Sequence, residues 1–123
     1  MTRNDIFEYV SNQYGTDPDY PWAKTPDAAV LRHRGSKKWY GLIMKVKPKS
    51  LGLSGAEEVD ILNLKCDHRL IGELIKQPCF KPAYHMNKEH WVTVLLGEAD
   101  NIKEIHSLID ISYELTNTDF RLM

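Results

Sequence analysis

Apolar residues near the start of the chain recur every three to four positions, which is the spacing of one buried helix face. Thr2 and Asp5 have the spacing of a capping box, and Gly15 is a typical helix stop. The pattern predicts a first helix over residues 3–14, and the three prolines and three aspartates of residues 16–28 predict a loop after it. The apolar positions of this helix are Ile6, Phe7, Val10 and Tyr14.

The pattern changes to strand-like runs in residues 29–47, on both sides of Gly35-Ser36. This arrangement predicts a β-hairpin with a tight turn at Gly35-Ser36. Alternation along the second strand predicts that one set of side chains faces the core and that the other is partly in contact with water. The core-facing set is Tyr40, Leu42, Met44 and Val46, and the other set is Trp39, Gly41, Ile43 and Lys45.

Residues 59–67 alternate again and predict a third strand, with Leu62, Leu64 and Cys66 on one face. Asp67 follows as a candidate cap for a short helix, and Pro78 ends that helix. Its apolar stripe comprises Leu70, Ile71, Leu74 and Ile75.

Two further strand-like runs, residues 83–86 and 90–96, flank Asn87-Lys88 and predict a hairpin with a two-residue turn. Asp100 is then expected to cap a last helix that ends near residue 116. The apolar residues of that helix are Ile102, Ile105, Leu108, Ile109 and Leu115.

In order, these elements predict one α+β domain with the arrangement α-β(3)-α-β(2)-α, an antiparallel sheet and helices packed on it. A chain of 123 residues has the length of one domain, which we place at residues 1–117 with a frayed tail at 118–123. No apolar run approaches the roughly 20 residues needed to cross a bilayer. The first residues also lack the pattern of a secretory signal, so we expect a cytoplasmic protein.

Charge is distributed unevenly, although the net charge is only −1. Residues 28–56 carry seven basic residues and no acid, which leaves a net charge of −8 on the rest of the chain. A segment of this kind is typical of polyanion binding, although lysines that only solvate two strands have the same pattern. Basic side chains neutralise phosphates, and neighbouring aromatic rings stack on bases. The residues predicted to bind nucleic acid are Arg32, Arg34, Lys37, Lys38, Trp39 and Lys45.

His85 and His90 are candidates for chemistry because a two-residue turn between them places them directly opposite each other. Their Cβ atoms are then about 4.5–5.5 Å apart, close enough to share a metal ion or a small ligand. A metal site needs three or four ligands, and no third ligand has a fitting spacing, so we predict no metal. The two side chains can equally form hydrogen bonds at the hairpin end. The candidate ligand pocket comprises Lys65, His85, Asn87, Lys88, His90 and Trp91.

A catalytic constellation is not recognisable in the sequence. The stretch LGLSG lacks the lysine and the strand-to-helix context of a phosphate loop, and no serine elbow is present. Cys66 and Cys79 lack C-x-x-C spacing and are expected to be reduced thiols. We therefore predict no catalytic residue, no cofactor and no enzyme activity.

Several blocks of the sequence, taken together and in order, resemble the MmcQ/YjbR family of small bacterial proteins. They are YPWAKTPDAAVLRHRGSKKWYGLIMKV, VDILNLKCD, LIGELI, FKPAYHMNKEHWVTVLL and LIDISYELT, and they span nearly the whole chain. His68 is a departure, because the family often has proline at that place. The resemblance implies a fold like that of secretion chaperones, of the double-wing type, and DNA binding. It implies no reaction, cofactor or catalytic residue.

Three functions therefore compete. The first is nucleic-acid binding through the basic hairpin, and the second is a protein-interaction module that uses the same sheet face or the loop with Trp22. The third is a small-ligand site around His85, His90, Trp39 and Lys65. The expected partners are DNA or a protein, with no membrane, and the chain is expected to be a monomer.

Overall fold

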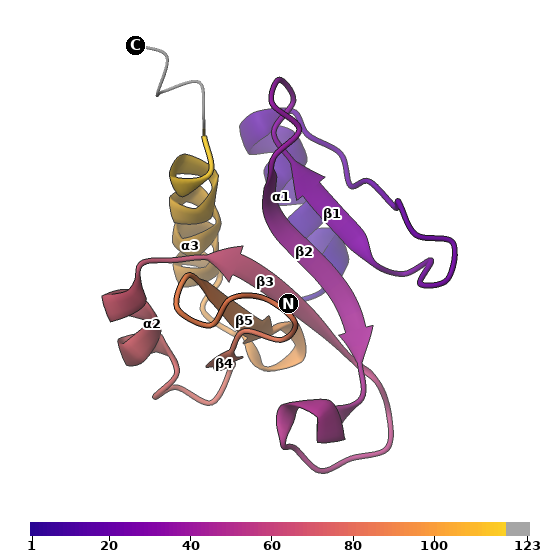
Figure 1. Ribbon diagram of the computed structural model, residues 1–123, viewed down its shortest axis with the longest axis vertical. Helices are drawn as coiled ribbons and strands as arrows, with labels where there is room; N and C mark the ends of the chain where they lie inside the picture. The colour runs from indigo at the N-terminus through magenta and orange to yellow at the C-terminus, as the bar shows by residue number, and fades with distance from the viewer. Residues whose placement is uncertain (118–123) are drawn as a thin grey trace.

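Three α-helices and a five-stranded antiparallel sheet make up the described part of the computed structural model, residues 1–117 (Figure 1). The predicted tail at 118–123 lies outside the described residues. The order α-β(3)-α-β(2)-α and the α+β class are confirmed. The strands lie in the order β1-β2-β3-β5-β4. The elements are α1 (Arg3–Tyr14), β1 (Ala29–Arg32), β2 (Trp39–Val46), η1 (Pro48–Leu51), β3 (Val59–Lys65), α2 (His68–Leu74), β4 (Phe80–Pro82), β5 (Trp91–Leu95), η2 (Leu96–Glu98) and α3 (Ile102–Leu115).

The helices begin and end largely where the sequence predicts. At the start of α1, the Thr2 hydroxyl accepts a hydrogen bond from the Asp5 N–H, and the Asp5 carboxylate accepts one from the Thr2 N–H. Gly15 ends this helix in the left-handed conformation, with φ 66°. Asp67 caps α2 as predicted, whereas α3 is capped by Asn101 and not by Asp100.

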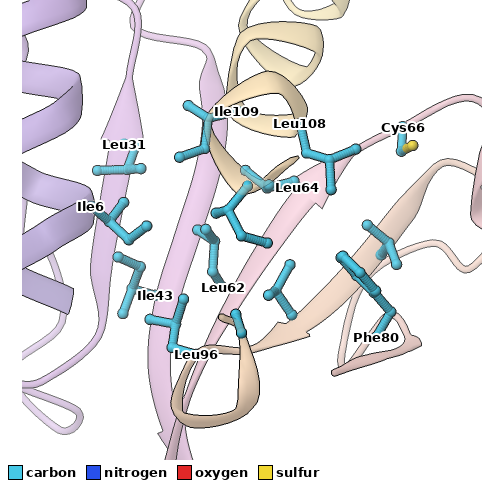
Figure 2. Close-up of a cluster of buried hydrophobic side chains, with 14 of the residues drawn as sticks. Ile6, Leu31, Ile43, Leu62, Leu64, Cys66, Phe80, Leu96, Leu108 and Ile109 are labelled. Carbon is cyan, nitrogen blue, oxygen red and sulfur yellow. The ribbon is translucent and has the colours of Figure 1, made fainter. Parts of the chain in front are cut away.

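The main core lies between one face of the sheet and helices α1 and α3 (Figures 1 and 2). Each fully buried leucine or isoleucine there contributes about 1.5–3 kcal/mol through the hydrophobic effect. Ile102 and Leu115, two of the apolar residues named for this helix, are exposed because they are the first and last residues of α3. Buried members include Ile6, Leu31, Ile43, Leu62, Leu64, Phe80, Leu108 and Ile109.

The faces predicted for Trp39 and Tyr40 in β2 are right, whereas those predicted for residues 41–46 are inverted because the strand contains a β-bulge. Leu31 pairs with Gly41 and Arg32 pairs with Trp39, so Tyr40 is an extra residue in β2. The bulge shifts the alternation by one position. Tyr40 and Ile43 therefore lie in the core under the helices. Leu42, Met44 and Val46 lie on the other side of the sheet, opposite Asn63, Ile61 and Val59 of β3.

We call the side of the sheet that faces away from α1 and α3 the outer face. A second, smaller apolar cluster of Val46, Ile61 and Leu95 lies there, and Leu51 of η1 and Tyr84 of the β4–β5 loop (residues 83–90) pack against it. These two segments therefore cover part of the outer face.

The predicted two-residue hairpin at Asn87-Lys88 is also wrong. Strand β4 ends at Pro82, which pairs with Val92, so an eight-residue loop replaces the tight turn. Asn87 organises the last turn of this loop, because its carbonyl accepts the N–H groups of His90 and Trp91. His85 and His90 are consequently not a cross-strand pair.

Aromatic side chains and one carboxylate join the β1–β2 hairpin to the helices. The ring of Tyr14 stacks on that of Tyr113 with 3.7 Å between centroids, and Tyr40 meets Tyr113 edge-on. The hydroxyls of Tyr9 and Tyr14 both donate to Asp110 of α3. Burial, followed by the hydrogen bond to Asp110, raises the pKa of Tyr9 to about 12, and burial raises the pKa of Tyr40 to about 12.

Within residues 1–117, no helix combines the length and the hydropathy that a membrane span requires.

Candidate binding surface on the outer face

Two of the predicted nucleic-acid-binding residues lie together on the outer face. Arg32 of β1 pairs with Trp39 of β2, and the Arg32 guanidinium carbon lies 5.7 Å from the centre of the Trp39 ring. Trp22, from the loop before β1, meets Trp39 edge-on with 5.6 Å between ring centroids. Trp22 is 37% exposed and Trp39 is half-buried, so both rings retain surface that a ligand can contact.

Two residues of the predicted ligand pocket belong to the same surface. Lys65 of β3 pairs with Trp91 of β5, and both side chains are half-buried. They lie on the outer face because Leu64 and Val92, the next residues on their strands, belong to the core under the helices. Gly41 pairs with Leu64, which brings Trp39 of the neighbouring strand to the same end of the sheet. We call this group the tryptophan surface; it comprises Trp22, Arg32, Trp39, Lys65 and Trp91.

The hairpin tip carries three more of the predicted residues, Arg34, Lys37 and Lys38, all exposed. The tip is a four-residue turn rather than the tight turn predicted at Gly35-Ser36. His33 closes it, because its N–H donates to the Lys38 carbonyl at 2.9 Å and its carbonyl accepts the Lys37 N–H at 3.1 Å. Lys37, and neither Gly35 nor Ser36, adopts the left-handed conformation, with φ 66°.

Carboxylates interrupt the basic segment. Asp19 accepts a hydrogen bond from Arg32 Nε at 2.9 Å, and Asp17 lies in the same shallow hollow as Arg34. Lys45 lies on the helix side of the sheet, where its Nζ is 3.8 Å from Asp60. The basic residues of positions 28–56 therefore do not form one continuous patch, because the fold places acids from other segments between them.

The remaining predicted pocket residues, His85, Asn87, Lys88 and His90, lie in the β4–β5 loop. His85 and Lys88 line one cavity, which neither Lys65 nor Trp91 lines. The predicted pocket is thus divided between the tryptophan surface and the loop. Within residues 1–117 no group of three or more His, Cys, Asp or Glu side chains is arranged to hold a metal ion.

Asn63 and Thr93 are important polar residues that our sequence analysis did not single out. Both are fully buried, on neighbouring strands β3 and β5 of the outer face. Thr93 Oγ1 donates to Asn63 Oδ1 at 2.5 Å and accepts the Tyr84 N–H at 2.8 Å, while Asn63 Nδ2 donates to the Tyr84 carbonyl at 2.9 Å. Together they fasten the β4–β5 loop to the sheet. The sequence does contain a signal for these two residues, because each is a polar residue inside an apolar run, ILNLK or WVTVL.

Cys66 and Cys79 are free thiols, as the sequence predicts. Burial raises the pKa of Cys66 to about 11, which disfavours the reactive thiolate at neutral pH.

Comparison with known proteins identifies the family of this chain. The sequence model of the YjbR family matches residues 11–115. The chain is 52% identical over 116 residues to the uncharacterised protein YyaQ of Bacillus subtilis (strain 168), and the aligned region covers 94% of this chain and 98% of YyaQ. It is 41% identical over 59 residues to the uncharacterised protein YbdF of Escherichia coli O157:H7, with 46% of this chain and 48% of YbdF covered.

Solved structures agree with this result. A crystal structure of a Pseudomonas syringae protein, 48% identical, superposes with a TM-score of 0.91 and covers 95% of this chain and 100% of its own. The Deinococcus radiodurans protein DR2400 is 23% identical, has a TM-score of 0.70 and covers 93% of this chain and 77% of its own, which shows the same fold.

Proposed function

This chain belongs to the YjbR family, and we propose that it binds single-stranded nucleic acid on the tryptophan surface of its sheet. The observation that carries the proposal is the gathering of three tryptophans with Arg32 and Lys65 at one end of the outer face. Aromatic rings beside cations are the usual construction of single-strand binding surfaces, because bases stack on the rings and phosphates meet the cations.

The spacing of the rings supports a polymer ligand. Trp39 and Trp91 lie on β2 and β5, with β3 between them. Two strand spacings separate their backbones by roughly 10 Å. Two different bases of one strand can therefore stack on the two rings, while Lys65 between them lies within reach of the connecting phosphate.

Single strands fit the charge pattern better than a duplex does. A duplex reader needs a continuous basic face for two phosphate backbones, whereas Asp19 pairs with Arg32 and Asp60 pairs with Lys45. The exposed cations at the tip, Arg34, Lys37 and Lys38, belong to the hairpin that carries Arg32 and Trp39. This refines the DNA binding predicted from the basic hairpin and keeps most of its residues.

The proposal is tested by titrating the protein with a ten-nucleotide oligothymidylate and following tryptophan fluorescence. Trp39→Ala and Trp91→Ala should each weaken binding roughly 10-fold or more, because stacking contributes about 1–3 kcal/mol per base. With four phosphate contacts, from Lys65 and the three tip cations, the logarithm of the binding constant should fall with the logarithm of salt concentration with a slope of about −3.

Lys103→Ala is the matched control, since Lys103 is an exposed cation on α3, away from the outer face. Its affinity should equal that of the parent. Absence of quenching at low salt, or equal affinity of Trp39→Ala and the parent, would overturn the proposal. Tighter binding to a duplex of the same length would reject the single-strand part.

A protein partner is the second candidate, and the exposure of Tyr20 favours it. Tyr20 is 49% exposed in a proline-containing loop beside the tryptophan surface. If a peptide docks there, Tyr20→Ser should abolish binding of that peptide while leaving oligothymidylate binding unchanged. Loss of both activities together would reject a separate protein site.

A further inference from the structure

We infer that a cavity between the β4–β5 loop and η1 binds a phosphate monoester, at a site separate from the tryptophan surface. The cavity measures about 420 Å³. This lies within the size range of small-molecule sites. No residue of the tryptophan surface lines it. Its lining residues are Ser50, Leu51, Lys81, Pro82, Ala83, Tyr84, His85 and Lys88.

The wall of this cavity is built on the buried Asn63–Thr93 pair. Both backbone polar groups of Tyr84 are bound by these two side chains, so Tyr84 has a fixed place above the sheet. The ring of the next residue, His85, stacks on the Tyr84 ring with 4.0 Å between centroids and 10° between planes.

His85 also has a strained backbone. Its φ of 58° lies in the left-handed region, where among residues 1–117 only one other non-glycine residue, Lys37, is found. Left-handed residues other than glycine persist where the surrounding structure holds them, and they gather at ligand sites. Here the hydrogen bonds of Tyr84 and the stacking of its ring on His85 stabilise the left-handed conformation of His85.

The polar side chains of the cavity have the charge that a phosphate needs. Lys81 pairs with Thr93 across the sheet and is half-buried on the outer face, and Lys88 lies in the loop above. Within residues 1–117 neither lysine forms an ion pair, and no carboxylate lines the cavity. The hydroxyl of Ser50 and the imidazole of His85 add hydrogen-bond donors.

The phosphate monoester follows from the match of charge and shape. Two lysines balance the charge of about −1.5 to −2 that a monoester carries at neutral pH. Leu51, Pro82 and Tyr84 present apolar surface to the carbon part of the ligand. The monoester can belong to a free phosphorylated small molecule or to the 5′-phosphate end of a nucleic acid, since both present the same group.

The site is tested by titrating glycerol phosphate into isotopically labelled protein and following the backbone amide NMR signals. Signals of residues 81 and 83–88, which have a backbone amide N–H, should shift in a saturable manner. The double variant Lys81→Gln/Lys88→Gln should weaken binding at least 10-fold, while Lys76→Gln should not change it, because Lys76 is an exposed lysine of another segment, paired with Glu73.

His85→Asn is a further variant that keeps the fold, because asparagine tolerates the left-handed conformation while lacking the imidazole. It should weaken binding without a change in melting temperature. Equal binding by the double variant and the parent, or the absence of saturable shifts at residues 81–88 with both glycerol phosphate and a 5′-phosphorylated oligonucleotide, would overturn the inference.

A pair of oligonucleotides, with and without a 5′-phosphate, identifies the source. Preference for the phosphorylated one, with no effect of glycerol phosphate, assigns the site to a nucleic-acid end, whereas binding of glycerol phosphate assigns it to small molecules. Trp39→Ala should leave the glycerol phosphate shifts intact, so a failure of the single-strand proposal is distinguishable from a failure of this one.

Discussion

Asn63 and Thr93 are polar residues in the middle of two apolar strands, and neither reaches solvent. Such residues are destabilising unless their hydrogen bonds are satisfied, and here they are satisfied by each other and by the backbone of Tyr84. Their position is therefore explained by the loop they hold, and not by the packing of the sheet. The left-handed backbone conformation of His85 costs about 1–3 kcal/mol, and it is maintained by the same hydrogen bonds to Tyr84.

Thr93→Val should reduce the free energy of unfolding by about 1–3 kcal/mol, because the isosteric change leaves Asn63 Oδ1 and the Tyr84 N–H without a partner. Urea unfolding measures the difference. Thr25→Val, at an exposed position of the loop before β1, is the control and should be nearly neutral. A stability of Thr93→Val within 0.5 kcal/mol of the parent, about the size of a neutral surface change, would show that the loop is not held by these bonds.

Strand β2 decides which side chains reach the core and which reach the tryptophan surface. Its bulge at Tyr40 allows a large ring to enter the core while Trp39 stays on the outer face opposite Arg32. Gly41 makes the close pairing possible, because a Cβ there would lie 2.8 Å from Leu31 Cδ1. The glycine is thus required by a neighbour on the adjacent strand rather than by its own backbone angles.

Gly41→Ala should destabilise the protein by about 1–3 kcal/mol, the usual effect of overpacking a core. Gly72→Ala is the matched control, since nothing lies within 4 Å of the added Cβ and the residue is in α2. Alanine favours the helix there, so this variant should be stabilised by up to about 1 kcal/mol. Thermal unfolding of both variants measures these two changes in stability. An unchanged melting temperature of Gly41→Ala would contradict the close packing of residue 41 against Leu31.

At the scale of the whole molecule, the tyrosines around Asp110 tie α1, α3 and the hairpin together. Burial raises the pKa of both Tyr9 and Tyr40 to about 12, above the ordinary value of 10.0. The unfolded chain therefore ionises first when pH rises, which stabilises the unfolded state. Stability from these groups is complete below pH 10 and is lost between pH 10 and 12.

Urea unfolding at pH 8–11.5 should accordingly show a free energy of unfolding that falls once the pH passes 10. The free energy of unfolding of Tyr9→Phe should fall less steeply with pH than that of the parent, because one of the titrating groups is absent. Circular dichroism at each pH follows the transition. Equal slopes for the variant and the parent would contradict the role given to Tyr9.

Local patterns were sufficient for the helices and for the order of elements. Thr2, Asp5 and Gly15 act within one helix, so their capping roles depend only on neighbours in sequence. The predicted pairing of His85 with His90 failed because Tyr84 bonds to residues more than eight positions away, on β3 and β5. The prediction for the faces of β2 failed after Tyr40 because one bulge reverses the face of every later residue in the strand.

The sequence by itself determined the α+β class, the strand order along the chain and the first helix, because caps, turns and hydrophobic period are properties of adjacent residues. Only the tertiary structure decided which charges remain available, since the partners of Arg32 and Lys45 come from other segments, at Asp19 and Asp60. It also decided that Trp22, Trp39 and Trp91 share one surface. Strand register and loop attachment bring distant residues together, and no local pattern contains that information.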